Sequence, residues 1–430
     1  MKKIRVGLIG YGTIGSGVVE SLRKKNKLLK DRSGLDIKVV KICDKNKAAL
    51  RKAKGMGAAL TGNANDILKD KTIDVVVELI GGTKAAKDVT LRAIKAKKHV
   101  VTANKALLAI HGREIFKLAQ DNGVSVGFEA SVAGGIPILK ALREGLISNR
   151  VDTIYGIING TSNFILTQME QGRCDFKKAL SEAKMKGFAE RNPELDINGV
   201  DSAHKLALLA LIGFKFSVNF KSIYVEGIKK IEPLDIEYAA ELGYTVKLLG
   251  IAKRVNGELE VRVHPTLLPN DYILSSVRGV YNAIFIRGDL IGRNLFYGKG
   301  AGKYPTASAV ISDIIEIGKN LKAGIKSYIL TPDTVNRIKH VRKFGKIETR
   351  YYIRFAAIDK PGVLARISGI LGRHNISIAS VTQKERRAAH VVPIVMMTHK
   401  AQEANMQKAL KEIGKMVAIK GKPVRIRVEN

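Results

Sequence analysis

The side chains best suited to chemistry in this chain stand directly before an apolar helix. They are three carboxylates and one lysine, namely Glu190, Asp196, Asp201 and Lys205. Asp201 and Lys205 are four residues apart, which on a helix places them on one face, one turn apart. The carboxylate can then orient the ammonium group, and the pair is suited to proton transfer with a polar substrate.

A simpler interpretation of the same pair is a helix cap with a solvated partner, an ion pair worth only about 0.3 to 0.5 kcal/mol. Two observations favour a binding site. Glu190 and Asp196 lie on a loop broken by Gly, Pro and Asn, and a loop rich in carboxylates beside a buried helix is suited to holding a polar substrate. Residues 206–212 are apolar on every face, which predicts a helix buried on most sides.

The elements that must position these groups begin with a nucleotide-binding pattern. An apolar strand over residues 4–10 runs into Gly10, Gly12 and Gly15, spaced as Gly-x-Gly-x-x-Gly, and a helical run follows over 16–25. This order is the dinucleotide fingerprint, because the glycines allow a tight turn and a close approach to the pyrophosphate. The helix N-terminus attracts the phosphates. We therefore expect a nicotinamide dinucleotide at this turn.

A second strand ends at Asp44, where an acidic residue can hydrogen-bond the adenine ribose. Lys45 and Lys47 follow and offer positive charge for a ribose phosphate, so the segment leaves NAD and NADP open. Buried strands over 74–82 and 99–105 complete a doubly wound parallel sheet of the Rossmann type.

Lys105 stands at the carboxyl end of a strand, the edge where such sheets bind ligands, and we expect it near cofactor or substrate. Glu129 and the glycine-rich turn 130–137 follow, and their carbonyls and single carboxylate could coordinate a hard monovalent or divalent cation. A loop of this composition is more often only a loop. Segments 159–163 and 297–310 supply small polar groups and a glycine-rich approach to a helix.

Length and composition limit the class of protein. A chain of 430 residues exceeds one hydrophobic core and predicts two or three domains. It contains no apolar run approaching the roughly 18 residues of a membrane span. Cys43 and Cys174 are the only cysteines, too few for a disulfide framework or a cysteine-rich zinc site, so we expect a cytoplasmic protein.

The formal net charge of +35 raises the question of nucleic-acid binding. The lysines are spread over the whole length, and no RNA-binding aromatic motif accompanies them. We therefore interpret the charge as a basic surface suited to anionic cofactors, with salt-dependent nonspecific binding but no dedicated nucleic-acid function.

The C-terminal part has a pattern of its own. After a lysine-rich connection over 321–350, residues 351–367 read as strand, turn and helix, and strands over 376–381 and 389–397, a helix over 402–413 and a strand over 424–428 follow. The order βαββαβ is the ferredoxin-like split motif. The run Asp-Lys-Pro-Gly-Val-Leu at 359–364 resembles the ACT domain, a small-molecule sensing module.

Residues 1–320 resemble the homoserine dehydrogenases. Six motifs carry the resemblance in the family's order, at 10–15, 102–105, 129–137, 159–163, 187–205 and 298–305. The resemblance implies an NAD(P)-dependent oxidoreductase that interconverts L-homoserine and L-aspartate 4-semialdehyde in threonine, methionine and isoleucine biosynthesis. Many relatives carry an arginine near the end of the second strand that favours NADP, and Cys43 and Asp44 in that place leave the preference open.

The resemblance also assigns residues. It implies that Lys205 is the proton donor and acceptor, that Lys105 is a second catalytic lysine, and that Asp201, Glu190 and the supporting Asp196 hold the substrate. It also implies a sodium site made of Glu129 with Val132, Gly134 and Ile136, the last three through backbone oxygens. Cofactor contacts are implied at Gly10, Gly12, Thr13, Ile14, Gly15, Asp44, Lys105, Gly187, Glu190 and Gly302.

The implied domains are 1–130 plus about 303–320 for the cofactor, 131–302 for catalysis and dimerisation, 321–350 as connection and 351–430 as ACT domain. The ACT resemblance implies regulation by an end product, with threonine as the candidate, bound near Asp359, Gly362 and Asn375. The family and the ACT domain together imply a homodimer or homotetramer. The alternative role of the ACT domain is subunit assembly alone. The alternative for the whole chain is a catalytically silent amino-acid sensor or basic nucleic-acid-associated protein, although Lys205, Asp201 and Lys105 are all retained.

Overall fold

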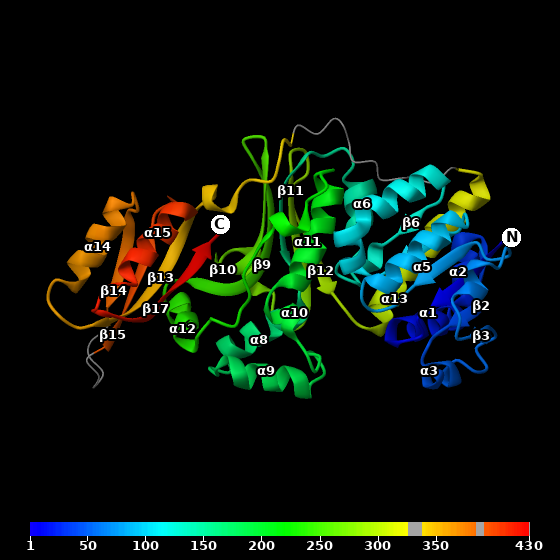
Figure 1. Ribbon diagram of the computed structural model, residues 1–430, viewed down its shortest axis with the longest axis horizontal. Coiled ribbons are helices and arrows are strands. Elements are labelled where there is room, and N and C mark those ends of the chain that lie inside the picture. The colour runs from blue at the N-terminus through cyan, green and yellow to red at the C-terminus, as the bar shows by residue number, and fades with distance from the viewer. Residues whose placement is uncertain (326–337, 384–390, 430) are drawn as a thin grey trace. The chain divides into compact units, whose positions relative to one another are not determined.

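The computed structural model describes residues 1–325, 338–383 and 391–429 (Figure 1). Two compact units are distinguished and are described separately. The first contains residues 1–154, 204–220 and 286–325, and the second contains 155–203, 221–285 and 338–429. The predicted connection over 321–350 and the predicted strand over 389–397 lie partly outside the described residues. Within the described residues, no helix is long and apolar enough to cross a membrane.

The first unit is built on a parallel sheet of six strands in the order β3-β2-β1-β4-β5-β6, which confirms the predicted doubly wound fold. The strands are β1 (Lys2–Ile9), β2 (Leu35–Cys43), β3 (Ala59–Thr61), β4 (Val75–Glu78), β5 (His99–Thr102) and β6 (Val126–Gly127). The central strands β1, β4 and β5 are rich in valine and isoleucine and mostly buried, as parallel strands covered by helices require.

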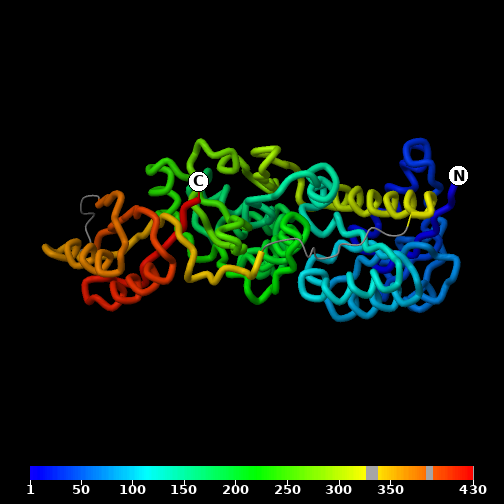
Figure 2. The backbone as a smooth tube through the Cα atoms, turned by 90° about the horizontal axis from the view of Figure 1, so that it is seen from above, coloured from blue at the N-terminus to red at the C-terminus, as the bar shows by residue number. Residues whose placement is uncertain are grey.

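The helices of this unit follow the strands in alternation. They are α1 (Thr13–Lys24), α2 (Asn26–Ser33), α3 (Lys47–Lys52), α4 (Asn65–Leu68), α5 (Lys84–Lys95), α6 (Lys105–Asn122), the short α7 (Ile138–Lys140) and α13 (Lys303–Ala323). Although α13 is remote in sequence, it lies beside α1 (Figure 2). A Cβ atom on Gly17 would come within 2.9 Å of the Lys303 carbonyl oxygen, so only glycine permits this approach.

A second sheet contains eleven strands of the described chain, in the order β12-β11-β7-β9-β10-β17-β13-β15-β14, with β8 beside β10 and β16 beside β13. Its strands before the C-terminal domain are β7 (Val151–Ile157), β8 (Tyr224–Val225), β9 (Tyr244–Val255), β10 (Glu258–Pro269), β11 (Tyr281–Gly288) and β12 (Gly292–Lys299). The accompanying helices are α8 (Gly160–Gln171), α9 (Phe176–Met185), α10 (Glu194–Ile197), α11 (Val200–Gly213) and α12 (Pro233–Glu241). Helix α11 carries the predicted apolar run, and Leu206 and Leu209 on it are fully buried, which confirms that prediction.

The C-terminal part has the predicted βαββαβ order, with the two-residue strand β16 added before the second helix. Its elements are β13 (Glu348–Ile358), α14 (Val363–Arg373), β14 (Ile378–Gln383), β15 (Val391–Thr398), β16 (Ala401–Gln402), α15 (Glu403–Ile413) and β17 (Ile419–Val428). The last strand pairs antiparallel with β13 and parallel with β10, so the sheet of this domain is continuous with β9 and β10.

Candidate active site

The glycine turn after β1 has the geometry of a pyrophosphate cradle. Gly10 has a φ of 103°, which favours glycine. A Cβ atom on Gly10 would lie only 2.5 Å from the Leu79 carbonyl oxygen, so the close approach of these two segments also requires glycine. A Cβ on Gly15 would overlap the carbonyl oxygen of Gly10, whereas a Cβ on Gly12 would meet no protein atom within 4 Å. Gly12 therefore leaves open space at the N-terminus of α1, where backbone N–H groups face anions.

Asp44 follows β2 at the same edge of the sheet. One oxygen of its carboxylate accepts a hydrogen bond from the Tyr11 N–H at 2.7 Å, and the other accepts from the Asn46 N–H at 2.8 Å. Asp44 thus ties the glycine turn to the end of β2, a structural task beside any contact with ribose. Lys45 and Lys47 next to it are exposed.

The strand that leads to Lys105 pairs with β4, which ends in a buried carboxylate that the sequence did not single out. Glu78 ends β4, is fully buried, and accepts a hydrogen bond from the Thr102 hydroxyl at 2.6 Å and from the Ile80 N–H at 2.6 Å. Burial raises the pKa of Glu78 to about 7. The only sequence signal was a glutamate ending a run of valines.

Asn104 caps α6, which begins at Lys105, and its amide donates to the carbonyl oxygens of Ile80 at 3.3 Å and Gly82 at 2.7 Å. Lys105 therefore starts a helix at the carboxyl edge of the sheet, as predicted. It belongs to the same edge as Gly10 and Asp44, since β1, β2, β4 and β5 pair in parallel register.

Glu129 lies in the first unit and is buried, with its two oxygens accepting the N–H groups of Leu139 at 2.9 Å and Lys140 at 2.8 Å. Burial raises the pKa of this carboxyl although both hydrogen bonds oppose the rise. Ala133 and Gly134 both have positive φ, at 51° and 32°, which bends the backbone of the turn sharply.

The donor set that the resemblance implies for this turn is the carboxylate of Glu129 with the backbone oxygens of Val132, Gly134 and Ile136. The charge of such a set is −1, which fits a hard monovalent cation. The described residues contain no group of three or more His, Cys, Asp or Glu side chains arranged for a metal ion.

The carboxylates before α11 are organised by Asn159, a residue the sequence analysis placed only in a polar segment. Its amide nitrogen donates to Asp196 at 2.7 Å and to Asp201 at 2.9 Å, and its oxygen caps α8 by accepting the Ser162 N–H at 2.8 Å. Asp201 is 5% exposed. One amide group thus brings together two predicted substrate carboxylates.

The first turn of α8 also fixes the two segments around this cluster. The Ser162 hydroxyl donates to the Asp196 carbonyl oxygen at 2.9 Å, and the Thr161 hydroxyl donates to the Phe188 carbonyl oxygen at 2.6 Å. Gly187 and Glu190 lie exposed on the turn beside Phe188, and Gly187 adopts a φ of 72°. The small polar residues at 159–163 are therefore the framework of the site.

Lys205 lies one helical turn after Asp201 on α11 and is half-buried. The i,i+4 spacing predicted from sequence is therefore realised on a continuous helix. Gly302 has a φ of 123° and directly precedes α13, where Lys303 binds Glu20 of α1 at 2.7 Å. The predicted cofactor residue Gly302 thus adjoins the helix that follows the glycine turn.

The predicted regulatory residues do not form one cluster within the chain. Gly362 is the N-cap of α14 and Asp359 precedes it, whereas Asn375 follows the C-terminus of that helix. Eleven residues of helix separate the two ends by about 16 Å, at about 1.5 Å per residue.

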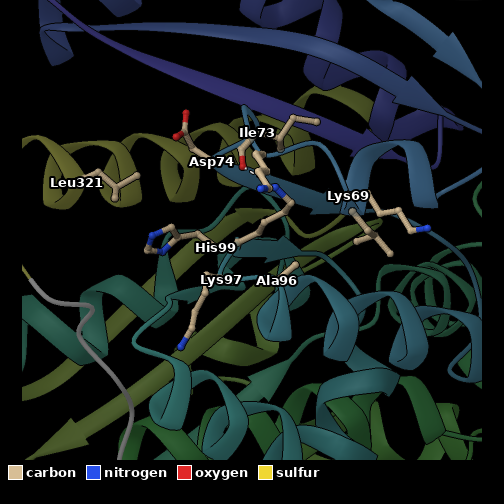
Figure 3. A pocket seen from close by; sticks show the side chains of 10 residues that line it. Lys69, Ile73, Asp74, Ala96, Lys97, His99 and Leu321 are labelled. Atoms are coloured by element: carbon tan, nitrogen blue, oxygen red, sulfur yellow. Dashed lines mark hydrogen bonds between the residues drawn. The ribbon is translucent and has the colours of Figure 1, made fainter.

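A cavity of about 590 Å³ opens at the amino edge of the first sheet (Figure 3). Lysines and His99 line it, and burial lowers the pKa of this histidine. None of the predicted site residues lines this cavity. It lies at the edge opposite Gly10 and Lys105, so it is not the expected cofactor site.

The fold and the glycine turn define an NAD(P)-dependent oxidoreductase that carries a C-terminal ACT domain. Three family models match the chain: "Homoserine dehydrogenase, NAD binding domain" at residues 10–129, "Homoserine dehydrogenase" at 137–315 and "ACT domain" at 351–417. The chain belongs to the homoserine dehydrogenase family.

Individual relatives agree with the family models. A homoserine dehydrogenase of Pseudomonas aeruginosa is 41% identical over 100% of this chain and 99% of its own length. The crystal structure of a homoserine dehydrogenase from Thiobacillus denitrificans superposes with a TM-score of 0.94 at 44% identity, covering 100% and 99% of the two chains. A hyperthermophilic archaeal homoserine dehydrogenase mutant in complex with NADPH is 26% identical, with a TM-score of 0.63 over 74% of this chain and 98% of that chain.

Proposed function

We propose that this chain interconverts L-homoserine and L-aspartate 4-semialdehyde with Lys205 as the group that transfers the proton. The observation that carries the proposal is the cluster in which Asn159 bridges Asp196 and Asp201 one turn before Lys205. A pair of oriented carboxylates suits the ammonium group of an amino-acid substrate. The archaeal relative in complex with NADPH supports a nicotinamide cofactor at Gly10–Gly15.

The chemistry of each residue follows from its position. The bound nicotinamide supplies hydride chemistry at its C4 atom. In the direction of reduction, Lys205 donates a proton from Nζ to the aldehyde oxygen, and in oxidation it accepts the proton of the homoserine hydroxyl. Asp201 orients Lys205 and binds substrate with Glu190, while Asp196 supports them. Lys105, at the start of α6, serves as the second catalytic lysine.

We assign the cation site to sodium, held by the carboxylate of Glu129 and the carbonyl oxygens of Val132, Gly134 and Ile136. The buried single carboxylate and the tight turn through Gly134 support a monovalent ion. The ion would stabilise the turn 130–137 between Glu129 and α7.

We propose that threonine binds the ACT domain and that the chain is a homodimer or homotetramer. Asp359 and Gly362 lie about 16 Å from Asn375 along α14, too far for one small amino acid to span, so a ligand contacting both ends would need a second chain. Activity measured with threonine up to millimolar concentrations distinguishes regulation from assembly. No change in rate would leave the ACT domain with the assembly role.

Two buried free cysteines, Cys43 and Cys174, support a place in the reducing cytoplasm.

The assay for the main proposal is absorbance at 340 nm with homoserine and with NAD and NADP side by side. We expect Lys205→Ala to lose at least about 100-fold in kcat, the factor typical of a general acid, while its affinity for cofactor is retained. Unchanged turnover in this variant would refute the role of Lys205. Met185→Ala, at an exposed side chain in the same unit as the substrate carboxylates, is the matched control and should keep full activity.

A further inference from the structure

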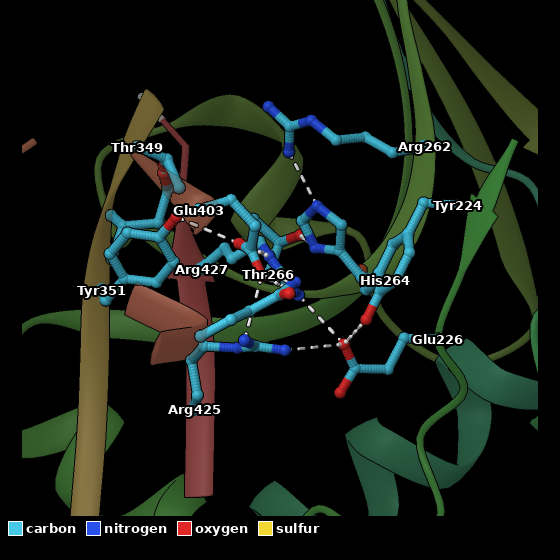
Figure 4. A network of polar contacts seen from close by, with 12 residues as sticks. Tyr224, Glu226, Arg262, His264, Thr266, Thr349, Tyr351, Glu403, Arg425 and Arg427 are labelled. Carbon is cyan, nitrogen blue, oxygen red and sulfur yellow. Dashed lines mark hydrogen bonds and ion pairs between the residues drawn. The ribbon is translucent and has the colours of Figure 1, made fainter. Parts of the chain in front are cut away.

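The last strand of the ACT domain forms a buried ion-pair cluster with the short strand β8 (Figure 4). Arg427 on β17 is fully buried, and its Nε and Nη2 donate to the two oxygens of Glu403 at 2.8 Å each. Its remaining nitrogen, Nη1, donates to Glu226 at 2.9 Å. One guanidinium group therefore binds a carboxylate of its own domain and a carboxylate of the segment after β8.

The position of Glu226 is fixed from three sides. The same carboxylate oxygen that accepts Arg427 also accepts the Tyr224 hydroxyl at 2.8 Å. The Glu226 N–H donates to the Val263 carbonyl oxygen of β10 at 2.8 Å. The Arg427 guanidinium lies 5.1 Å from the ring centroid of Tyr224 and 4.8 Å from that of Phe344, and these rings help to shield the guanidinium from water, whereas the Glu226 side chain is partly exposed.

The residues directly after Glu226 contact the substrate segment, residues 196–201, which carries both Asp196 and Asp201. The Ile228 N–H donates to the Ile197 carbonyl oxygen at 2.9 Å. Gly227 lies so close to α10 that a Cβ atom on it would come within 2.5 Å of the Asn198 Cα. On the other side, a Cβ on Gly199 would lie 3.3 Å from the Glu226 carbonyl oxygen. The backbones of 226–228 and 197–199 therefore have no room to move independently.

The substrate segment continues from this contact without a break. Ile197 is the last residue of α10, Asp196 precedes it, and Asp201 follows at the start of α11. Both carboxylates are held by the Asn159 amide, as described above. A continuous set of contacts thus joins Arg427 of the ACT domain, through Glu226, to Asp196 and Asp201.

We propose that Glu226 is a positioning residue for the substrate carboxylates and that Arg427 of the ACT domain holds it in place. The inference rests on the proposed function, since it concerns how homoserine is bound. The ACT domain would thereby influence the affinity for homoserine. A shift of β17 would displace Glu226, and the backbone at Gly227, which contacts α10, would move with it. Cofactor binding should not respond, since the glycine turn after β1 makes no contact in this set.

The test uses the full-length chain with Glu226→Gln, Arg427→Lys and the double variant. Glutamine keeps the size of the side chain and one acceptor, so this variant preserves packing. We expect KM for homoserine to rise about 2- to 30-fold, the range of couplings carried by contact networks, with kcat unchanged. The affinity for cofactor, measured by calorimetry, should stay at the wild-type value. Arg427→Lys also loses the paired hydrogen bonds to Glu403, so the double variant should raise KM no further than Arg427→Lys alone, in which the contact with Glu226 is already broken.

Arg354→Lys is the matched control. Arg354 lies on β13, is almost as buried as Arg427, and pairs with Asp235 at 2.6 Å and Glu232 at 2.6 Å, two carboxylates outside the contacts that join Arg427 to Glu226. This variant should lower the melting temperature without raising KM. A Glu226→Gln enzyme with wild-type KM, or an Arg354→Lys enzyme with an equally raised KM, would overturn the inference. If the wild-type chain itself does not oxidise homoserine, the proposed function is wrong, which separates the two failures.

Discussion

Replacing Asn159 by aspartate tests the core of the site with a change of one atom. Aspartate caps a helix as well as asparagine does, so the α8 cap formed with the Ser162 N–H is retained. The amide donor is lost, and with it the hydrogen bonds to Asp196 at 2.7 Å and to Asp201 at 2.9 Å. A third carboxylate then stands between two others.

The magnitude follows from these two bonds. A hydrogen bond to a charged group contributes about 1.5 to 3 kcal/mol to stability. The loss of two such bonds should lower the free energy of unfolding by about 3 kcal/mol, the lower end of their summed contribution, because water can reach the half-buried Asp196. Asp201 is 5% exposed and has no such replacement. Displacement of these groups by about 1 Å would lower kcat/KM for homoserine about 100-fold.

The assay pairs urea denaturation with initial rates at 340 nm under saturating cofactor. The control is Asn149→Asp, where the side-chain oxygen likewise accepts a backbone N–H, from Ile291 at 2.8 Å, but no carboxylate is bound. We expect the control to keep wild-type kcat/KM and to lose little stability. An Asn159→Asp enzyme that matches the control in both measurements would refute the bridging role of the amide.

Two further predictions concern the first unit. Gly12→Ala should weaken cofactor binding in calorimetry but leave the melting temperature unchanged, because the new Cβ meets no protein atom within 4 Å. Gly15→Ala should also lower the melting temperature, because its Cβ would overlap the Gly10 carbonyl oxygen. Equal affinity for cofactor in Gly12→Ala and wild type would contradict the pyrophosphate assignment. Burial raises the pKa of Asp313 to about 8 from 3.8, so the folded state holds an extra proton between these values and loses stability as pH rises through that window. Asp313→Asn should remove a pH dependence of the free energy of unfolding of about 1.4 kcal/mol per pH unit. If the stabilities of the two proteins changed in parallel between pH 5 and 9, the result would contradict this prediction.

Much of the fold could be predicted because its signals are local. The Gly-x-Gly-x-x-Gly turn after an apolar strand, the valine-rich strands and the βαββαβ order all appear in the structure. The helix α2 was not predicted, since six of its eight residues are polar and none is buried. A helix without an apolar face gives no periodic signal.

The helical spacing of Asp201 and Lys205 could be predicted, but the residues that hold the neighbouring carboxylates could not. Asp201 and Lys205 were found because a four-residue spacing has a fixed meaning on a helix. Glu78 was missed because a glutamate ending a buried strand gives no sign that Thr102 and Ile80 will satisfy it. Asn159 was seen only as one of several polar residues, although its amide connects both substrate carboxylates.

The sequence by itself determined the glycine turn, the one-turn spacing of Asp201 and Lys205 and the presence of an ACT domain, since each depends on residues close together in the chain. Only the tertiary structure decided that Asn159 meets Asp196 and Asp201, which are 37 and 42 positions away, and that Glu226 meets Arg427, which is 201 positions away. Spacing along a helix or strand fixes which neighbours share a face. Contacts between remote segments depend on how whole elements pack, and no local pattern records that.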